Sequence, residues 1–497
     1  MFSALTAFVL SGWATRVFGL DAMGLLILAN SVVAYLMLLD FGAGSALPRM
    51  LPRMLTSRDR PRVDELLSTA VFLLVGPAVI AVLISPFLTH LVVSVVPAPA
   101  GLESAAYWTV WVSIAAAGAC LPMRLGFGML GAVSRFDTFF VYESVGMALK
   151  LGVGGLVLYA GSSLPWYAAA MALPALVVSI AQFATGLRMM GATTMRFSLF
   201  RSWALGALLT MCGASLVMTL ASTVTTQGGT LLIGLFGSSS DIALFGFPLI
   251  LVTTAMSFAG PFGAFLSPVV SALHGSRDEK RMRAILVATV RLATVLAGLI
   301  AAALIALGPV VLPLWLGPEA IAGGRLESMA TLLSIFALGF AVFVPGSALK
   351  GLLMSAGSPW PMAITELVAA AAAMLVAALL YAVWGFGLHA IAVSITLGLF
   401  VRGFLLFPLL AATRLRENAP AFIVDLFCRP LLVTIAATAS ALLPYGTLDA
   451  SSPVLPFAAL AIYGITWSIG TYWFVFPAEV KLRVTAAWRS SPQQKDV

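Results

Sequence analysis

Long apolar runs alternate with short polar loops along the whole chain. A membrane-spanning helix needs about 20 consecutive apolar residues, and runs of roughly this length recur from one end to the other. The expected spans are 1–18, 23–47, 66–85, 105–123, 138–159, 164–185, 204–224, 242–266, 284–307, 328–348, 361–383, 387–411, 422–443 and 454–477. The pattern therefore predicts an all-α polytopic membrane protein with about fourteen transmembrane helices. The apolar, proline-interrupted residues after the third span are expected to lie along the outer membrane interface.

The composition agrees with a membrane protein. Of 497 residues, 61% are hydrophobic and only 9% are charged, whereas about a quarter of a soluble domain is charged. The net charge of +8 does not indicate nucleic-acid binding, because the basic residues are spread over many loops. Cys120, Cys212 and Cys428 lie far apart in apolar segments, so their spacing predicts neither a disulfide nor a metal site. No cofactor is expected.

The basic residues predict the orientation of the chain. On one side of the expected membrane, the loops and the C-terminal tail hold 21 of the 27 Lys and Arg residues, and the opposite loops hold two. Lys and Arg concentrate on the cytoplasmic side of membrane proteins. We therefore expect both termini in the cytoplasm and the protein in a bacterial inner membrane.

Two internal matches predict a repeat. Ser57-Arg58-Asp59, in the basic loop 40–65, recurs as Ser276-Arg277-Asp278, 219 positions later. Gly residues 15 positions before Glu143 and before Glu366 give a second match with an offset of 223. Spans 1–6 and 7–12 are thus expected to be parallel repeats, with the substrate between the two halves. The expected domains are a six-helix lobe at 1–203, a second at 204–417, and two extra helices with a cytoplasmic tail at 418–497.

Two segments resemble a known family. FGLDAMGLLILANSVVAYLMLLDFGAGSALPRML (residues 18–51) and LLIGLFGSSSDIALFGFPLILVTTAMSFAGPFGAFLSPVVSALHGSRD (residues 231–278) are similar to segments of Wzx-type bacterial polysaccharide exporters. These belong to the multidrug/oligosaccharidyl-lipid/polysaccharide exporter superfamily. The resemblance implies two six-helix lobes around a V-shaped cavity. It also implies flipping of undecaprenyl-pyrophosphate-linked oligosaccharide across the membrane, with polymerisation and export proteins as functional partners.

Cations deep in a span are functional candidates, because burying charge in hydrocarbon is costly. Lys150 lies about 12 residues into its span, which is roughly 18 Å at the helical rise, and Arg402 is similarly deep. Each is a candidate for binding an anionic cargo, against the alternative of a purely structural charge. Arg291 is nearer the edge and is expected to extend its side chain to the interface.

Three further arginines are candidates for the cavity. The resemblance places Arg16 there, at the outer end of the first span. Arg49 and Arg53 are four residues apart at the exit of the second span. They are suited to holding phosphate at the cytoplasmic mouth, although the cytoplasmic preference of arginine explains them equally.

Glu143, Glu366 and Asp40 are candidates for coupling transport to protons. Glu143 is seven residues from Lys150, so a helix places both on one face. A partly desolvated carboxyl there would titrate near neutral pH. The alternatives are a pair between Glu143 and a loop arginine such as Arg124 or Arg135, and a helix-end or loop-partner role for Asp40. Asp425 and Arg429 have the spacing of a self-neutralised helical pair.

Other functions stay open at this point. The sequence carries no catalytic cluster or phosphate-binding Gly-Lys loop, and we expect a transporter rather than an enzyme. A lipid II flippase is mechanistically alike. A drug or cation antiporter would need acidic groups, whereas the deep charges include Lys150 and Arg402. A membrane glycan polymerase or ligase is less compatible, because such enzymes usually have a large outer loop.

Overall fold

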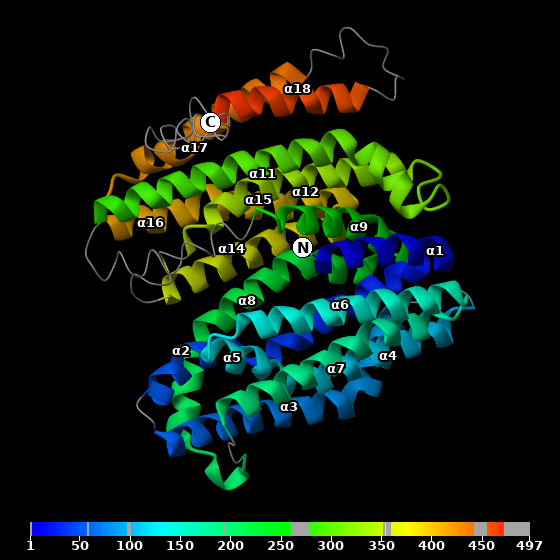
Figure 1. Ribbon diagram of the computed structural model, residues 1–497. Coiled ribbons are helices and arrows are strands. Elements are labelled where there is room, and N and C mark those ends of the chain that lie inside the picture. The colour runs from blue at the N-terminus through cyan, green and yellow to red at the C-terminus, as the bar shows by residue number, and fades with distance from the viewer. Residues whose placement is uncertain are drawn as a thin grey trace, which may run out of the picture. The chain divides into compact units, whose positions relative to one another are not determined.

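The computed structural model describes residues 2–56, 59–96, 101–191, 195–259, 279–350, 353, 359–441 and 455–471. Every regular element within these ranges is a helix (Figure 1). Eleven helices in the described chain are long and apolar enough to cross a membrane. A twelfth is added if α4 (Glu103–Cys120) and the segment Pro122–Ala132, bent by 47°, form one span. The prediction of an all-α polytopic membrane protein is confirmed, while the number fourteen stays a prediction.

Packing divides the chain into two compact units. The first comprises Met1–Pro248, Leu312–Met329 and Glu366–Ile391. Its helices are α1 (Phe2–Leu36), η1 (Met37–Asp40), α2 (Ala43–Thr56), α3 (Arg60–Val95), α4, η2 (Pro122–Arg124), α5 (Leu125–Ala132), α6 (Phe136–Tyr159), α7 (Leu164–Met190), η3 (Phe197–Leu199) and α8 (Ser202–Phe236). Most of α9 (Ser239–Met256), the end of α11 (Glu279–Leu316), most of α14 (Trp360–Ala378) and the π-helix η4 (Leu379–Val383) also belong to it.

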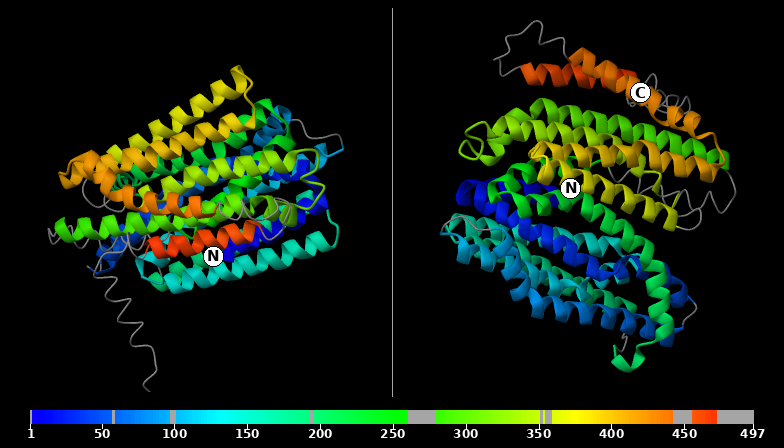
Figure 2. Two further views of the ribbon diagram at one scale, coloured as in Figure 1. Left: turned by 90° about the horizontal axis from the view of Figure 1, so that it is seen from above. Right: turned by 180° about the vertical axis from the view of Figure 1, so that it is seen from behind.

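The second unit contains the remaining helices. They are most of α11, most of α12 (Arg325–Ser347) and most of α15 (Leu388–Phe400), together with the end of α9 and the start of α14. The π-helix η5 (Val401–Leu406), α16 (Phe407–Leu415), α17 (Ala419–Ala441) and α18 (Leu455–Gly470) lie wholly in this unit. Helices α17 and α18 pack side by side, as Figure 2 also shows from behind. The predicted lobe boundaries at 203/204 and 417/418, and the repeat itself, stay predictions.

The basic segment after the second expected span is a helix rather than a loop. Leu47 and Leu51 on α2 are fully buried, and α2 packs against α3, α5 and α8. The buried core around α2 is Ala43, Leu47, Leu51, Val63, Leu66, Leu67, Ala70, Leu74, Leu125, Met129, Ala132, Met190, Ala204, Leu208 and Cys212. Burial of this apolar face outweighs the helix-weakening effect of Pro48 and Pro52. The expectation of a loop over the whole of residues 40–65 was wrong.

Two long helices differ from the sequence-based expectation. Within α1 the backbone is non-helical at Gly19 (φ 83°, ψ 172°), a conformation that glycine adopts readily. Two helical segments therefore meet there, close to the expected break between spans 1 and 2. Helix α3 continues through Pro77 and Pro86 as 36 residues. The prolines do not end it, so the expected interfacial segment after residue 85 is helical up to Val95.

Candidate functional site

Lys150 lies on the face of α6 that packs against α7. One turn before it, Gly146 contacts the Val178 side chain, and one turn after it, Gly154 contacts Met171 and Leu10. Residues four apart on a helix share a face, so the lysine stands between two close helix contacts. Its side chain is half-buried. It makes no hydrogen bond or ion pair with any described residue, although its charge acts on the Cys120 thiol.

Glu143 lies on the same helix face, two turns before Lys150. Its Oε1 accepts a hydrogen bond from Nε2 of Gln182 on α7 at 2.9 Å, and Gln182 is 5% exposed. Beside it, the hydroxyls of Tyr142 and Thr185 are 2.8 Å apart. The interface of α6 and α7 therefore carries a polar stripe of these four residues, two turns before the lysine and separated from it by the contact of Gly146 with Val178. The shared face of Glu143 and Lys150 agrees with the sequence-based expectation.

The arginines proposed as alternative partners of Glu143 bind other carboxylates. Arg124 Nε lies 3.0 Å from Oδ2 of Asp40, and Arg135 Nε lies 3.0 Å from Oδ1 of Asp137. The hydrogen bond that Arg135 donates to the Asp137 carboxylate, together with the negative charge of that carboxylate, raises the pKa of Arg135 above the ordinary value. The alternative in which Glu143 pairs with a loop arginine such as Arg124 or Arg135 was therefore wrong.

Asp40 organises the exit from α1. Its Oδ1 accepts from the backbone N–H of Gly42 at 2.7 Å while its Oδ2 binds Arg124. Phe41 and Gly42 have positive φ angles, so the chain turns sharply between η1 and α2. This geometry agrees with the loop-partner alternative for Asp40. The carboxylate links the turn to η2, between α4 and α5.

Arg16 is placed at the end of a helix. It is exposed, and its guanidinium donates to the backbone carbonyl of Leu314 in the last turn of α11. Gly317 follows that helix with φ 92°. A cation at a helix C-terminus binds carbonyls that have no partner within the helix. For Arg49 and Arg53 on α2, the side chains lie outside what the structure describes.

Arg402 is one of the most buried side chains of the second unit, at 1% exposure. Its Nε donates to the Gly398 carbonyl at 3.2 Å, and its guanidinium lies 5.0 Å from the centre of the Phe343 ring. It belongs to the π-helical turn η5, next to Gly403, whose backbone contacts α12 closely at Gly346. The ammonium of Lys350 lies 5.4 Å from the same Phe343 ring. Arg402 is thus built into the packing of η5 and α12.

Glu366 differs from its repeat counterpart. It lies on α14 and is 1% exposed, whereas Glu143 is half-buried. The carboxylate buried more deeply is therefore the one in the second expected repeat. Both stay predicted coupling residues.

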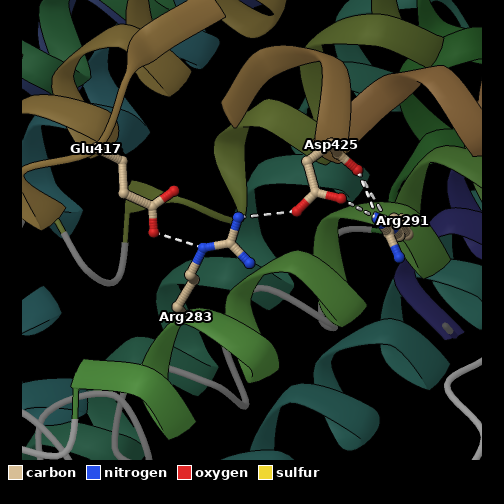
Figure 3. A network of polar contacts seen from close by, with 4 residues as sticks. All are labelled: Arg283, Arg291, Glu417 and Asp425. Carbon is tan, nitrogen blue, oxygen red and sulfur yellow. Dashed lines mark hydrogen bonds and ion pairs between the residues drawn. The ribbon is translucent and has the colours of Figure 1, made fainter. Parts of the chain in front are cut away.

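A charged network that the sequence does not predict joins α11 to α17 (Figure 3). Arg283 Nη2 lies 2.9 Å from Oδ2 of Asp425, and Arg283 also binds Glu417. Arg291, only 11% exposed, binds the other Asp425 oxygen and donates to the Asp425 backbone carbonyl at 2.8 Å. The predicted pair of Asp425 with Arg429 is therefore wrong, as is the expected extension of Arg291 to the interface. The partners are more than 130 residues apart, so local spacing gives no signal.

An apolar cavity of about 540 Å³ begins one turn beyond Arg291. It is enclosed by α11, α12, α15, η5, α17 and α18. Its lining comprises Thr294, Gly298, Ala301, Ala302, Ile305, Ala306, Pro309, Leu338, Ala341, Val342, Phe400, Phe404, Phe427, Leu431, Thr434, Ala459 and Tyr463. Within the described part of the chain, no three His, Cys, Asp or Glu residues are grouped to hold a metal.

Comparisons with known proteins reveal the fold. No protein-family model matches the chain, and no curated protein matches it. Among solved structures, an inward-facing multidrug resistance transporter of the MATE family in the MOP superfamily matches with TM-score 0.71 and 15% identity, over 84% of this chain and 95% of its own. The lipid II flippase MurJ, in an inward closed conformation, matches with TM-score 0.71 and 13% identity, over 95% of this chain and 96% of its own.

A third structure is a MOP superfamily transporter from Pyrococcus furiosus, described as having a binding pocket of reverse polarity that suggests a different function. It matches with TM-score 0.58 and 15% identity, over 84% of this chain and 96% of its own. At such low identities the similarity establishes the fold. The chain is a multi-pass membrane protein with the fold of MOP superfamily transporters.

Proposed function

We propose that this protein is a flippase that moves an undecaprenyl-pyrophosphate-linked oligosaccharide across the bacterial inner membrane by alternating access. The observation that carries the proposal is Lys150. It is an ammonium well inside a membrane helix, half-buried and without an ion pair in the described structure. An uncompensated cation at such a place is costly and marks a substrate path. An anionic pyrophosphate supplies the missing partner.

The physical demands of the cargo agree with the polar stripe along α6. Sugars and a pyrophosphate do not cross hydrocarbon unaided, because unpaired charge there is very unfavourable. The hydrogen-bonded groups of Glu143, Gln182, Tyr142 and Thr185 provide polar contacts at the same helix interface, two turns before Lys150. The Glu143 carboxylate also provides a group whose protonation would alter the charge along the path of the anion.

The comparisons support a flippase more than a drug antiporter. The MurJ match covers 95% of this chain and the MATE match covers 84%. The difference is about the size of the segment from α17 to α18. The Pyrococcus protein supports the idea that the MOP fold carries binding pockets of opposite polarity.

A lipid II flippase is the second candidate, and the extent of the MurJ match favours it. Lipid II also joins a pyrophosphate to a polyprenyl chain and sugars, so Lys150 fits both cargoes. Only the glycan distinguishes them.

Deletion of the gene, with labelling of lipid-linked glycans, tests the proposal. We expect repeat units to accumulate facing the cytoplasm, and to be released by the wild-type gene but not by Lys150→Ala. Arg135→Ala removes a cation that is paired at the surface and serves as the control. Rescue of cells depleted of their lipid II flippase would instead assign lipid II. Normal distribution of both glycans after deletion would overturn the proposal.

We further propose that both termini lie in the cytoplasm. A reporter fused after Gly161, which follows α6, is then expected to read external, and one fused after Arg201 cytoplasmic. A cytoplasmic signal at Gly161 would contradict this orientation.

A further inference from the structure

The cavity in the second unit has a graded lining. Arg291 and Asp425 bind each other within one turn before its first lining residues on α11 and α17, Thr294 and Phe427. Thr294 and Gly298 follow on α11, and beyond them the lining is Ala301, Ile305 and Pro309. From Thr294 to Pro309, α11 rises about 22 Å. The hydrocarbon core of a bilayer is about 30 Å thick, so an acyl chain that spans one leaflet fits within that length.

Two hydroxyl groups lie beside Gly298 in this cavity, those of Thr434 and Tyr463, and the Thr434 hydroxyl donates to the Pro430 carbonyl at 2.9 Å. Tyr463 lines the cavity and is 2% exposed, and its hydroxyl is buried without a hydrogen-bond partner among the described residues. The hydroxyl lies beside Gly298 on α11, since a methyl group there would be 3.7 Å from it. Buried hydroxyls nearly always have a partner. The unpartnered Tyr463 hydroxyl therefore indicates a ligand with an oxygen acceptor at this level.

The charged end of the cavity carries excess positive charge. Glu417 and Asp425 face the guanidinium groups of Arg283 and Arg291. Arg429, one turn beyond Asp425 on α17, is exposed and forms no ion pair with a described residue. An anionic group there would give Arg429 a partner and balance the excess positive charge.

We propose that this cavity is a binding site for a diacyl glycerophospholipid, separate from the transported cargo. One acyl chain lies along Ala301–Pro309, its ester carbonyl accepts a hydrogen bond from the Tyr463 hydroxyl, and the phosphate lies toward Arg291 and Arg429. The order of the groups matches the order along α11: charge before the lining begins, then hydroxyl groups beside Gly298, then only hydrocarbon from Ala301 to Pro309.

The ester distinguishes this occupant from a polyprenyl chain. A polyprenyl phosphate has no carbonyl between its phosphate and its hydrocarbon, so it leaves the Tyr463 hydroxyl without a partner. Seven residues on α11 separate Arg291 from Gly298, or about 10 Å along the helix. The long side chain of Arg291 shortens this distance. The phosphate of one lipid can therefore bind Arg291 while its first ester carbonyl binds the Tyr463 hydroxyl.

The site is tested by lipid binding to the full-length protein. The purified, delipidated protein is titrated with dioleoyl phosphatidylglycerol and with its dialkyl ether analogue, which lacks both carbonyls, and bound lipid is counted by native mass spectrometry. We expect the ester lipid to bind about three- to tenfold more tightly, the effect of one neutral hydrogen bond. Tyr463→Phe should bind both lipids equally, at the affinity of the ether lipid.

Two more variants complete the design. Tyr167→Phe alters a tyrosine equally buried, at 2% exposure, in the first unit, and should keep the preference for the ester. Arg429→Gln should weaken both lipids about tenfold and leave their ratio unchanged. An equal ester preference in wild type and Tyr463→Phe, or tighter binding of a polyprenyl phosphate than of phosphatidylglycerol, would overturn the proposal. Unchanged binding in Arg429→Gln would overturn the position of the phosphate.

Discussion

Lys150 and Arg402 are two cations at similar expected depth, one in each unit, and their surroundings differ completely. Lys150 is half-buried between the glycine contacts of α6 and forms no ion pair in the described chain. Arg402 is 1% exposed, bound to the Gly398 carbonyl and stacked on Phe343. Depth in a span therefore does not separate a charge available to a ligand from one committed to packing. The difference lies in the partners that neighbouring helices supply.

Of the variants considered, Arg402→Ala should have the largest effect, a decrease in the stability of the folded protein. Removing a large buried side chain leaves a cavity beside Phe343, and such changes cost about 3 kcal/mol or more. We expect a lower unfolding temperature of the purified protein and less protein in the membrane. Arg402→Lys is the matched variant, because it keeps the charge but loses the planar stacking. If the Arg402→Ala protein is stable and has lost only transport, Arg402 has the substrate-binding role proposed for Lys150.

Asp425→Asn tests Arg291, a largely buried cation that has an ion-pair partner. Arg291 is 11% exposed, against 1% for Arg402, and has a carboxylate partner. Neutralising Asp425 leaves the charge of Arg291 without a counter-charge, which should cost about 2 kcal/mol of stability. Thermal unfolding measures the loss, and Arg283→Gln, at the more exposed end of the network, should cost less. Equal losses from the two variants would contradict the importance of the burial of Arg291.

Lys150→Ala should leave stability nearly unchanged and lower transport at least tenfold, about 1.4 kcal/mol. The lysine has no ion pair to lose, whereas the anionic cargo loses its counter-charge. Surface glycan, normalised to membrane protein, measures the effect. Lys150→Arg should retain part of the activity because the charge remains. If Lys150→Ala instead lowers the amount of protein in the membrane, Lys150 has a structural role like that of Arg402.

Glu143→Gln should have the smallest effect on stability, within about 0.5 kcal/mol. A glutamine oxygen still accepts the hydrogen bond from Gln182, so the stripe along α6 stays connected. Transport assayed with and without a proton gradient then reports on coupling. If Glu143 couples protons, the variant should not respond to the gradient. Full export with an unchanged response would leave the residue a structural hydrogen-bond acceptor.

The elements that the sequence predicted well are those in which one long apolar run decides the structure. Helices α6, α7 and α12 fall close to the expected spans. Helix α2 was missed because its two prolines and its arginines are typical of a loop, while the burial of Leu47 and Leu51 depends on distant helices. Tertiary packing overrides local preference there.

The candidate site shows the same limit. The common face of Glu143 and Lys150 follows from helical spacing, which is local. The partners do not: Asp425 binds Arg283 and Arg291 from α11 instead of its helical neighbour Arg429. The cavity with Tyr463 is assembled from five separate stretches of chain. No pattern within one stretch predicts such a lining.

The packing of the N-terminal helix has a consequence for the order of folding. The Phe8 ring stacks on Trp315 with centroids 4.5 Å apart, and Trp315 Nε1 donates to the Phe8 carbonyl. These partners are separated by about 300 residues, which a ribosome adds in about 15 to 60 s. This segment of α1 thus waits through the synthesis of about 300 further residues before its native neighbour exists. The native packing of Phe8 can therefore form only after Trp315 has been synthesised.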